Sequence, residues 1–245
     1  MNRAIVQLTA RQLLGQRRSL LLAGFALLPV GIALLYRFNG AQPDHVRWTA
    51  NMLGARLIVG TLLPISALIF GTAALGSEFE DGTAVYLLSK PLPRSQVVLS
   101  KLLVAWLATA VLVVVSVLVA GAIAIRDIPA EGVLLAFSVA VVAGSLVYCC
   151  VFVLLSVLTS RALITGLLYV FIWEGLVTAL FSGTKFLSVR QYTVGLAKWL
   201  TSTSERTFSA RLDGLEALIL MATVGAAATW LAIRALKRWE IGESG

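Results

Sequence analysis

The feature that most constrains this chain is a series of long stretches that contain no charged side chain. Five such stretches occur, at residues 19–36, 57–77, 102–125, 132–160 and 217–233. A membrane-spanning helix needs about 20 predominantly apolar residues, and each stretch is near or above that length. A sixth stretch, 162–184, is interrupted only by Glu174. The sequence therefore predicts an all-α membrane protein with six transmembrane helices.

The overall composition agrees with this interpretation. Of the 245 residues, 59% are hydrophobic and only 13% are charged, whereas soluble globular domains carry about 25% charged residues. A soluble enzyme or a basic nucleic-acid-binding domain is therefore not expected. We assign the whole chain, 1–245, to one transmembrane domain, with spans one and two in 19–75, spans three to five in 97–182, and span six with its tail in 214–245.

Basic residues are unevenly divided between the two sides that six crossings create. Eleven flank the first and last spans or lie in the loops of that same side: Arg3, Arg11, Arg17, Arg18, Lys90, Arg94, Lys101, Arg161, Arg234, Lys237 and Arg238. The short loops of the other side carry four, and five more lie in one long segment, 183–213, which we leave out of the comparison because it is longer than the other loops. Over the short loops, the bias follows the positive-inside rule. Both termini are therefore predicted to be cytoplasmic. The net charge of +8 is explained by contact with anionic lipid, not by nucleic acid.

Two segments outside the spans have helical patterns. In residues 1–18, Ile5, Leu8 and Leu13 form one face and arginines another, which predicts an amphipathic helix in the membrane interface, with a plain cytoplasmic extension as the alternative. The stretch after it is longer than the apolar core of a signal peptide, so we expect an uncleaved first span. In 183–213, aromatic and leucine residues recur at helical spacing and predict one or two short helices in, or lying on, the outer leaflet.

Residues that could perform chemistry are scarce. The one histidine, His45, follows Pro43 and Asp44 in a turn-like stretch, and the two cysteines, Cys149 and Cys150, are adjacent within a span. Metal sites need several such ligands, and the chain has no glycine-rich phosphate-binding loop. We expect no catalytic residue, metal or cofactor in this chain, so any ATP that drives it must be bound by another protein.

Three residues within the spans are candidates for a transport path. Glu174 lies in the fifth span, Arg56 lies near the outer end of the second, and Pro64 follows in the same span. A charge at membrane depth is expensive and by default marks a pathway or a partner. Arg56 is a possible partner of Glu174, and the alternatives are a structural ion pair, a polar helix–helix contact or a direct role in substrate passage. Pro64 is expected to kink its helix.

The connector between the second and third spans, 76–96, is unusually charged for so apolar a chain. Its segment EFEDGTAVYLLSKPLPRS begins with three acids, which suit a helix N-terminus, and ends with two prolines. Tyr86, Leu87 and Leu88 would be poorly placed in a solvated loop. We therefore predict a compact cytoplasmic structure that another protein grips.

This connector resembles the signature of the permease subunits of type-2 ATP-binding-cassette (ABC) exporters. The family pattern is roughly Glu-x-Glu-x-Gly-Thr, then Leu-Leu, then Pro-x-x-Arg, then Gly-Lys. It is filled here by Glu78, Glu80, Gly82, Thr83, Leu87, Leu88, Pro91, Arg94 and Lys101. Ser100 stands in place of the glycine before the lysine. The six-span layout, the N-terminal helix and the long segment 183–213 extend the resemblance over nearly the whole chain.

The resemblance implies a division of labour between chains. Two permeases, in the simplest case identical, would pair in a bacterial inner membrane, and each would dock one cytoplasmic ATPase that binds Mg-ATP. The ATPase contacts would be Glu78, Glu80, Asp81, Gly82, Thr83, Arg94 and, in a second loop at 158–162, Arg161. The second and fifth spans would line an export path that switches access as ATP is used. A non-transporting binding, immunity or signalling subunit is the alternative, and the substrate is left open.

Overall fold

A computed structural model describes residues 9, 13, 17–38, 44–80, 93–125, 132–201 and 207–242, and within these ranges every regular element is a helix. The helices in chain order are α2 (Arg17–Ala26), α3 (Leu28–Phe38), α4 (His45–Trp48), η1 (Thr49–Leu62), α5 (Leu63–Glu80), α7 (Arg94–Ala124), α8 (Val133–Leu158), α9 (Ala162–Leu168), η2 (Tyr169–Val177), α10 (Thr178–Leu180), η3 (Ser182–Leu187), α11 (Val189–Leu200) and α12 (Gly214–Gly242). The predicted interfacial helix, 1–18, lies almost entirely outside the described residues and stays a prediction.

Five of the helical segments are long and apolar enough to cross a membrane: Leu21–Phe38, His45–Gly76, Arg94–Ala124, Val133–Leu158 and Gly214–Lys237. They correspond to the five charge-free stretches, so the all-helical membrane fold is confirmed. The fifth predicted span, in the stretch 162–184, is not a single full-length helix. Its apolar helix covers only Ala162–Val177, because the chain leaves the helix after Leu180 and turns through η3 into α11.

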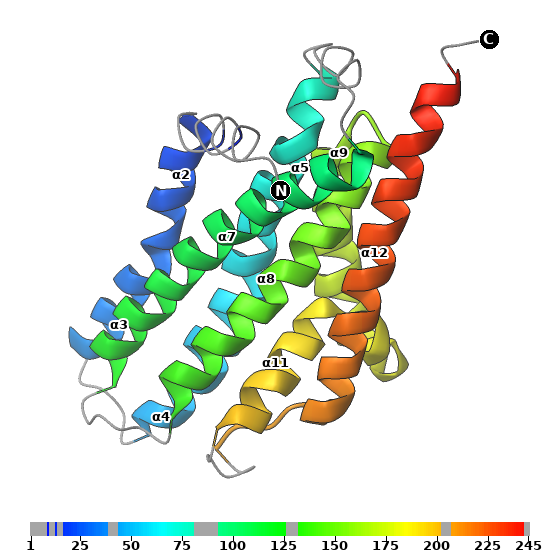
Figure 1. Ribbon diagram of the computed structural model, residues 1–245. Coiled ribbons are helices and arrows are strands. Elements are labelled where there is room, and N and C mark those ends of the chain that lie inside the picture. The colour runs from blue at the N-terminus through cyan, green and yellow to red at the C-terminus, as the bar shows by residue number, and fades with distance from the viewer. Residues whose placement is uncertain are drawn as a thin grey trace.

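The helices run between two ends of an elongated bundle (Figure 1). At one end lie the start of α2, the end of α5, the start of α7, the turn from α8 to α9 and the end of α12; we call this the terminal end. At the opposite end lie the last residues of α3, α7 and α11 and the first residues of α4, α8 and α12. The two loops predicted to contact an ATPase therefore leave the bundle at the same end.

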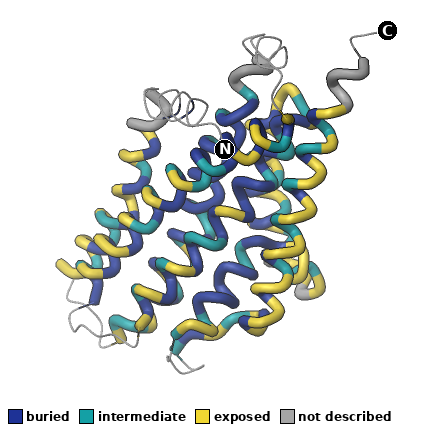
Figure 2. The backbone as a smooth tube through the Cα atoms, in the orientation of Figure 1, coloured by how far each residue is buried: buried dark blue, intermediate teal, exposed yellow. Residues whose placement is uncertain are grey.

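Helix α8 is the centre of the bundle and packs against α5, α7, α11 and α12. In Figure 2 most of α8 is coloured dark blue, for buried residues, whereas the outer helices carry many exposed residues, coloured yellow. Small residues allow close contact between helices in a membrane. A Cβ added at Gly144 of α8 would overlap Thr193 of α11, and one added at Gly71 of α5 would lie 2.9 Å from the Cβ of Phe152.

Polar side chains on α7 and α12 bond to α8 and α2 within this apolar interior. Trp106 Nε1 donates to the Val142 carbonyl over 2.9 Å, and Ser116 Oγ donates to the Ala26 carbonyl over 2.9 Å. The adjacent cysteines face different neighbours: Cys149 Sγ lies 3.6 Å from Thr109 Oγ1 of α7, and Cys150 Sγ accepts from Thr229 Oγ1 of α12 over 3.3 Å. Both cysteines are buried and free, so they contribute to the packing between helices.

The close approach of α8 and α11 generates a stability prediction. Gly144→Leu should lower the free energy of unfolding by about 1–3 kcal/mol, because the added side chain must displace Thr193 from a filled interface. The measurement is thermal unfolding of the purified protein in a mild detergent. The control is Gly31→Leu on α3, where an added Cβ meets nothing within 4 Å. Equal melting temperatures for the two variants would contradict the packing of α8 against α11.

Candidate functional site

Two helical segments in the structure have π-helical hydrogen bonding. They are η1, of 14 residues, and η2, of 9 residues; the bond from Leu63 N–H to the Ile58 carbonyl illustrates the wider turn. π-Helices usually occur as single turns and frequently mark functional sites. The two segments lie in the second and fifth predicted spans, the same two that the family resemblance assigns to the transport path. Nothing in the apolar pattern of the chain indicated them.

Pro64 marks the point where one of these segments ends. It is buried and is the second residue of α5, directly after η1 ends at Leu62. Proline has no backbone N–H to donate, which is tolerated in the first turn of an α-helix. The kink predicted at Pro64 stays a prediction. The structure shows at this point a change from π-helical to α-helical bonding within one continuous span, His45–Gly76.

Glu174 of η2 is buried, with only 2% of its surface exposed. Its Oε1 accepts from Val189 N over 2.8 Å and from Tyr169 Oη over 3.2 Å, and lies 3.5 Å from Arg190 N. Its Oε2 accepts from Ser188 Oγ. Val189 is the first residue of α11, and a helix N-terminus carries partial positive charge and free N–H groups. The Glu174 carboxylate is therefore a cap for α11, supplied from another helix.

The predicted pairing of Glu174 with Arg56 is wrong. Both residues lie in the described part of the chain, and no ion pair joins them: Arg56 is exposed, and its guanidinium NH1 lies 3.9 Å from Met52 Sδ. The physical reason is that the amide and hydroxyl donors at the start of α11 already satisfy the carboxylate. Of the alternatives that the sequence left open, the contacts of Glu174 are those of a polar helix–helix contact.

Other side chains fasten the turn between η2 and α11. Trp173 Nε1 donates to the Leu187 carbonyl over 3.0 Å, and Tyr192 Oη donates to the Phe186 carbonyl. From the chain before α12, Arg211 donates to the Thr178 carbonyl over 3.0 Å. Helix α11 is buried between α8 and α12 over most of its length. It is thus part of the bundle instead of lying on a surface.

Arg190, the second residue of α11, has a role that sequence reasoning missed. Its guanidinium lies against η1 at Gly60, where an added Cβ would come within 3.1 Å of Arg190 Cζ. The side chain is half-buried, and its guanidinium makes no hydrogen bond or ion pair with any part of the chain that the structure describes. The sequence analysis used Arg190 only in the count of basic residues on each side of the membrane. Nothing in the sequence shows that α11 packs against the second span.

The connector lies mostly outside the described residues. Nothing is described of Asp81, Gly82 and Thr83, or of the side chains of Glu78 and Glu80, although α5 continues through Glu80. Arg94 is the first residue of α7 and is buried, and Arg161 precedes α9 and is exposed. These positions stay candidates for contact with an ATPase.

Lys101 connects the two helices that flank the connector. It is 1% exposed, and its Nζ donates to the Ala74 carbonyl of α5 over 2.7 Å. Near the end of α5, a Cβ added at Gly76 would lie 3.7 Å from Ser156 Cβ of α8, two residues before that helix ends. Ser100 is buried within an uninterrupted α7, so its departure from the family pattern does not disturb the helix. The two helices that flank the connector are thus held to each other, and α5 also contacts α8 near its end.

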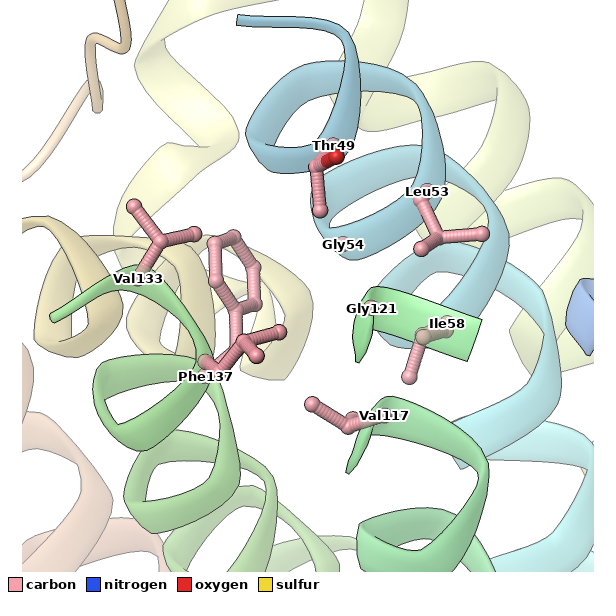
Figure 3. Close-up of a pocket in the computed structure, with 9 residues that line it drawn as sticks. Thr49, Leu53, Gly54, Ile58, Val117, Gly121, Val133 and Phe137 are labelled. Atoms are coloured by element: carbon pink, nitrogen blue, oxygen red, sulfur yellow. The ribbon is translucent and has the colours of Figure 1, made fainter. Parts of the chain in front are cut away.

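One cavity lies between η1, α7 and α8 (Figure 3). Phe137, Leu53 and Val117 are among the apolar residues that line it, and Thr49 Oγ1, a buried hydroxyl without a hydrogen-bond partner, is at its edge. Its volume is about 10 Å³, close to the space for one water molecule. This cavity is therefore too small for a transported molecule.

A comparison with protein families identifies the class of this chain. The model of the family described as "ABC-2 family transporter protein" matches residues 4–204. The chain therefore belongs to this family, whose members are membrane transport components. A search of curated proteins found no match.

The capping role of Glu174 can be tested by removing the carboxylate. Glu174→Ala should lower the free energy of unfolding by about 2 kcal/mol or more, because it leaves buried N–H and O–H donors unsatisfied. Thermal unfolding in detergent provides the measurement. The control, Glu216→Ala, removes an exposed acid from the first turn of α12. If both variants melt at the same temperature, the carboxylate does not hold η2 and α11 together.

Proposed function

We propose that this chain is the membrane-spanning subunit of an ATP-driven exporter. It would form a substrate path with a second permease, and two separate cytoplasmic ATPases would switch that path between access states. The observation that carries the proposal is the family match over 4–204. A second observation supports it: the connector 76–96 and the turn at 158–162 leave the bundle at the same end (Figure 1), where one partner could contact both.

We further infer six crossings, with the fifth formed by broken helices. Helix α8 ends at the terminal end and α12 begins at the opposite end (Figure 1), so the chain between them has to cross the bundle. Segments α9 and η2 cover the first part of this path, and α11 covers the last. An even number of crossings puts both termini on one side, and the excess of basic residues makes that side cytoplasmic.

Movement of an ATPase would reach the membrane through the anchored ends of the connector. The hydrogen bond from Lys101 to the Ala74 carbonyl holds α7 against α5, and α5 continues directly from η1. A displacement of the connector would therefore move the second span as a unit with the start of the third. In this scheme Mg-ATP is bound and hydrolysed by the partner ATPases, and this chain contributes only the moving path.

The second permease would complete the path along the fifth span. Large apolar side chains of η2 are exposed, among them Phe171, Ile172 and Leu176. A symmetric pair is the commonest oligomer, so we propose an identical second copy in a bacterial inner membrane. Apolar exposure is also expected where a helix faces lipid, so the partner must be identified by experiment.

The proposal is tested by co-purification of an ATPase with the tagged chain in mild detergent. Glu80→Lys reverses a charge in the connector and should abolish co-purification or reduce ATP turnover of the assembled complex at least tenfold. Glu216→Lys makes the same change at the opposite end of the bundle, on an exposed residue of α12, and should behave as the natural chain does.

Two results would contradict this scheme. If Glu80→Lys assembles and turns over ATP normally, the connector is not the coupling element. If no ATPase co-purifies with the natural chain, a non-transporting binding, immunity or signalling subunit becomes the better explanation.

A further inference from the structure

Two arginines come together on one face of the second span. Arg56 projects from η1 itself and is exposed, and Arg190 reaches from α11 to lie against Gly60, four residues further along η1. Residues four or five apart share one face of a helix of this width. The two guanidinium groups therefore occupy neighbouring positions on the same side of η1, although they are far apart in the sequence.

Arg190 lies deep within the membrane in this arrangement. Helix α11 ends with Leu200 at the opposite end of the bundle (Figure 1), and a rise of 1.5 Å per residue puts Arg190 about 15 Å from that end. The hydrocarbon core of a bilayer is about 30 Å thick. With the end of the bundle at the edge of that core, Arg190 is near its middle, and Arg56 lies about one turn nearer the opposite end.

Neither guanidinium has a carboxylate partner among the described residues. The acid nearest to Arg190 in the fold is Glu174, whose oxygens are taken by Ser188, Val189 and Tyr169. Arg56 has only the weak sulfur acceptor of Met52. Positive charge without a counter-charge at this depth is unfavourable and by default marks a functional site.

Two other basic residues of this region do not share that property. Lys185 Nζ donates to the Arg211 carbonyl over 3.3 Å and lies over the Phe186 ring, and Arg211 donates to the Thr178 carbonyl. These two cations connect the turn between η2 and α11 to the chain before α12. The guanidinium groups of Arg56 and Arg190, by contrast, have N–H donors that bond to no oxygen acceptor among the described residues.

We propose that Arg56 and Arg190 bind the anionic group, a phosphate or carboxylate, of an amphiphilic cargo. The inference rests on the proposed function, since it names the substrate class of that path. Guanidinium groups present paired N–H donors that match the oxygens of phosphate and carboxylate. The exposed Met52 side chain and the half-buried Leu57 offer an apolar surface beside Arg56 for the rest of such a molecule.

Gly60 is part of this site because it leaves space. A Cβ at this position would lie 3.1 Å from Arg190 Cζ and 3.2 Å from Nε and NH2. An added Cβ would therefore require the guanidinium to shift by a few tenths of an ångström. The absence of a side chain at Gly60 thus allows the Arg190 guanidinium to lie on the face of η1 that carries Arg56. The backbone conformation of Gly60 plays no part in this.

The test is direct binding of a fluorescent phosphatidylglycerol to the purified full chain in detergent, with phosphatidylcholine as the zwitterionic reference. The natural chain should prefer phosphatidylglycerol, and Arg56→Gln and Arg190→Gln should each weaken binding about tenfold, the loss of one charge-assisted contact. Arg190→Lys, which keeps the charge but not the paired donors, should lie between. Inorganic phosphate at millimolar concentration should not displace the lipid.

The matched control is Arg47→Gln, which removes an exposed positive charge from α4, directly before η1 in the same span. It should bind phosphatidylglycerol as the natural chain does. Equal weakening by Arg47→Gln would show general attraction to a basic surface and overturn the site. So would unchanged binding by both Arg56→Gln and Arg190→Gln, or displacement by inorganic phosphate, which would indicate a free anion as ligand.

Failure of this site and failure of the exporter proposal are distinguishable. The binding measurement needs no ATPase, and the co-purification experiment needs no lipid ligand. Binding of phosphatidylglycerol through both arginines without recruitment of an ATPase would support the anion site and contradict the exporter proposal. Recruitment of an ATPase without arginine-dependent binding would support the exporter proposal and contradict the anionic cargo.

Discussion

The carboxylate of Glu174 is buried where it meets the first residues of α11. A helix that begins within a membrane exposes backbone N–H groups that lipid cannot satisfy. Glu174 accepts from Val189 N and from Ser188 Oγ, so the acid and the helix start satisfy each other. The broken path through η2, η3 and α11 depends on this exchange, because without it the Val189 N–H would be buried without this acceptor and the carboxylate would keep only the bond from Tyr169.

One consequence of this exchange is that two arginines have no carboxylate partner among the described residues. The start of α11 occupies the oxygens of Glu174, and the acid forms no ion pair with Arg56 or Arg190. The start of α11 also brings Arg190 against η1, at a glycine that leaves room for it. The contact between η2 and α11 therefore also positions Arg190 on the face of η1 that we propose as the anion site.

The contact between α5 and α7, the two helices that flank the connector, links η1 to the terminal end of the bundle. Lys101 is a buried lysine whose ammonium group bonds to the Ala74 carbonyl, an acceptor inside α5. Because α5 and η1 form one continuous span, a force on the connector would reach the turn of η1 that carries Arg56. Pro64 stands where the hydrogen-bonding pattern changes, a position suited to a small adjustment in the length of that span.

The sequence by itself determined the membrane class, five full-length spans and the segments that join them, since long charge-free stretches leave a chain few alternatives to apolar helices. It also pointed to Glu174 and Arg56 as unusual charges, because charge at membrane depth is visible without a structure. Only the tertiary structure decided what those charges contact. Residue spacing does not show that α11 turns back into the bundle, that its N-terminus satisfies Glu174, or that Arg190 reaches Gly60. These contacts join segments distant in the chain, and they depend on how close α8, α11 and η1 can pack at Gly144 and Gly60.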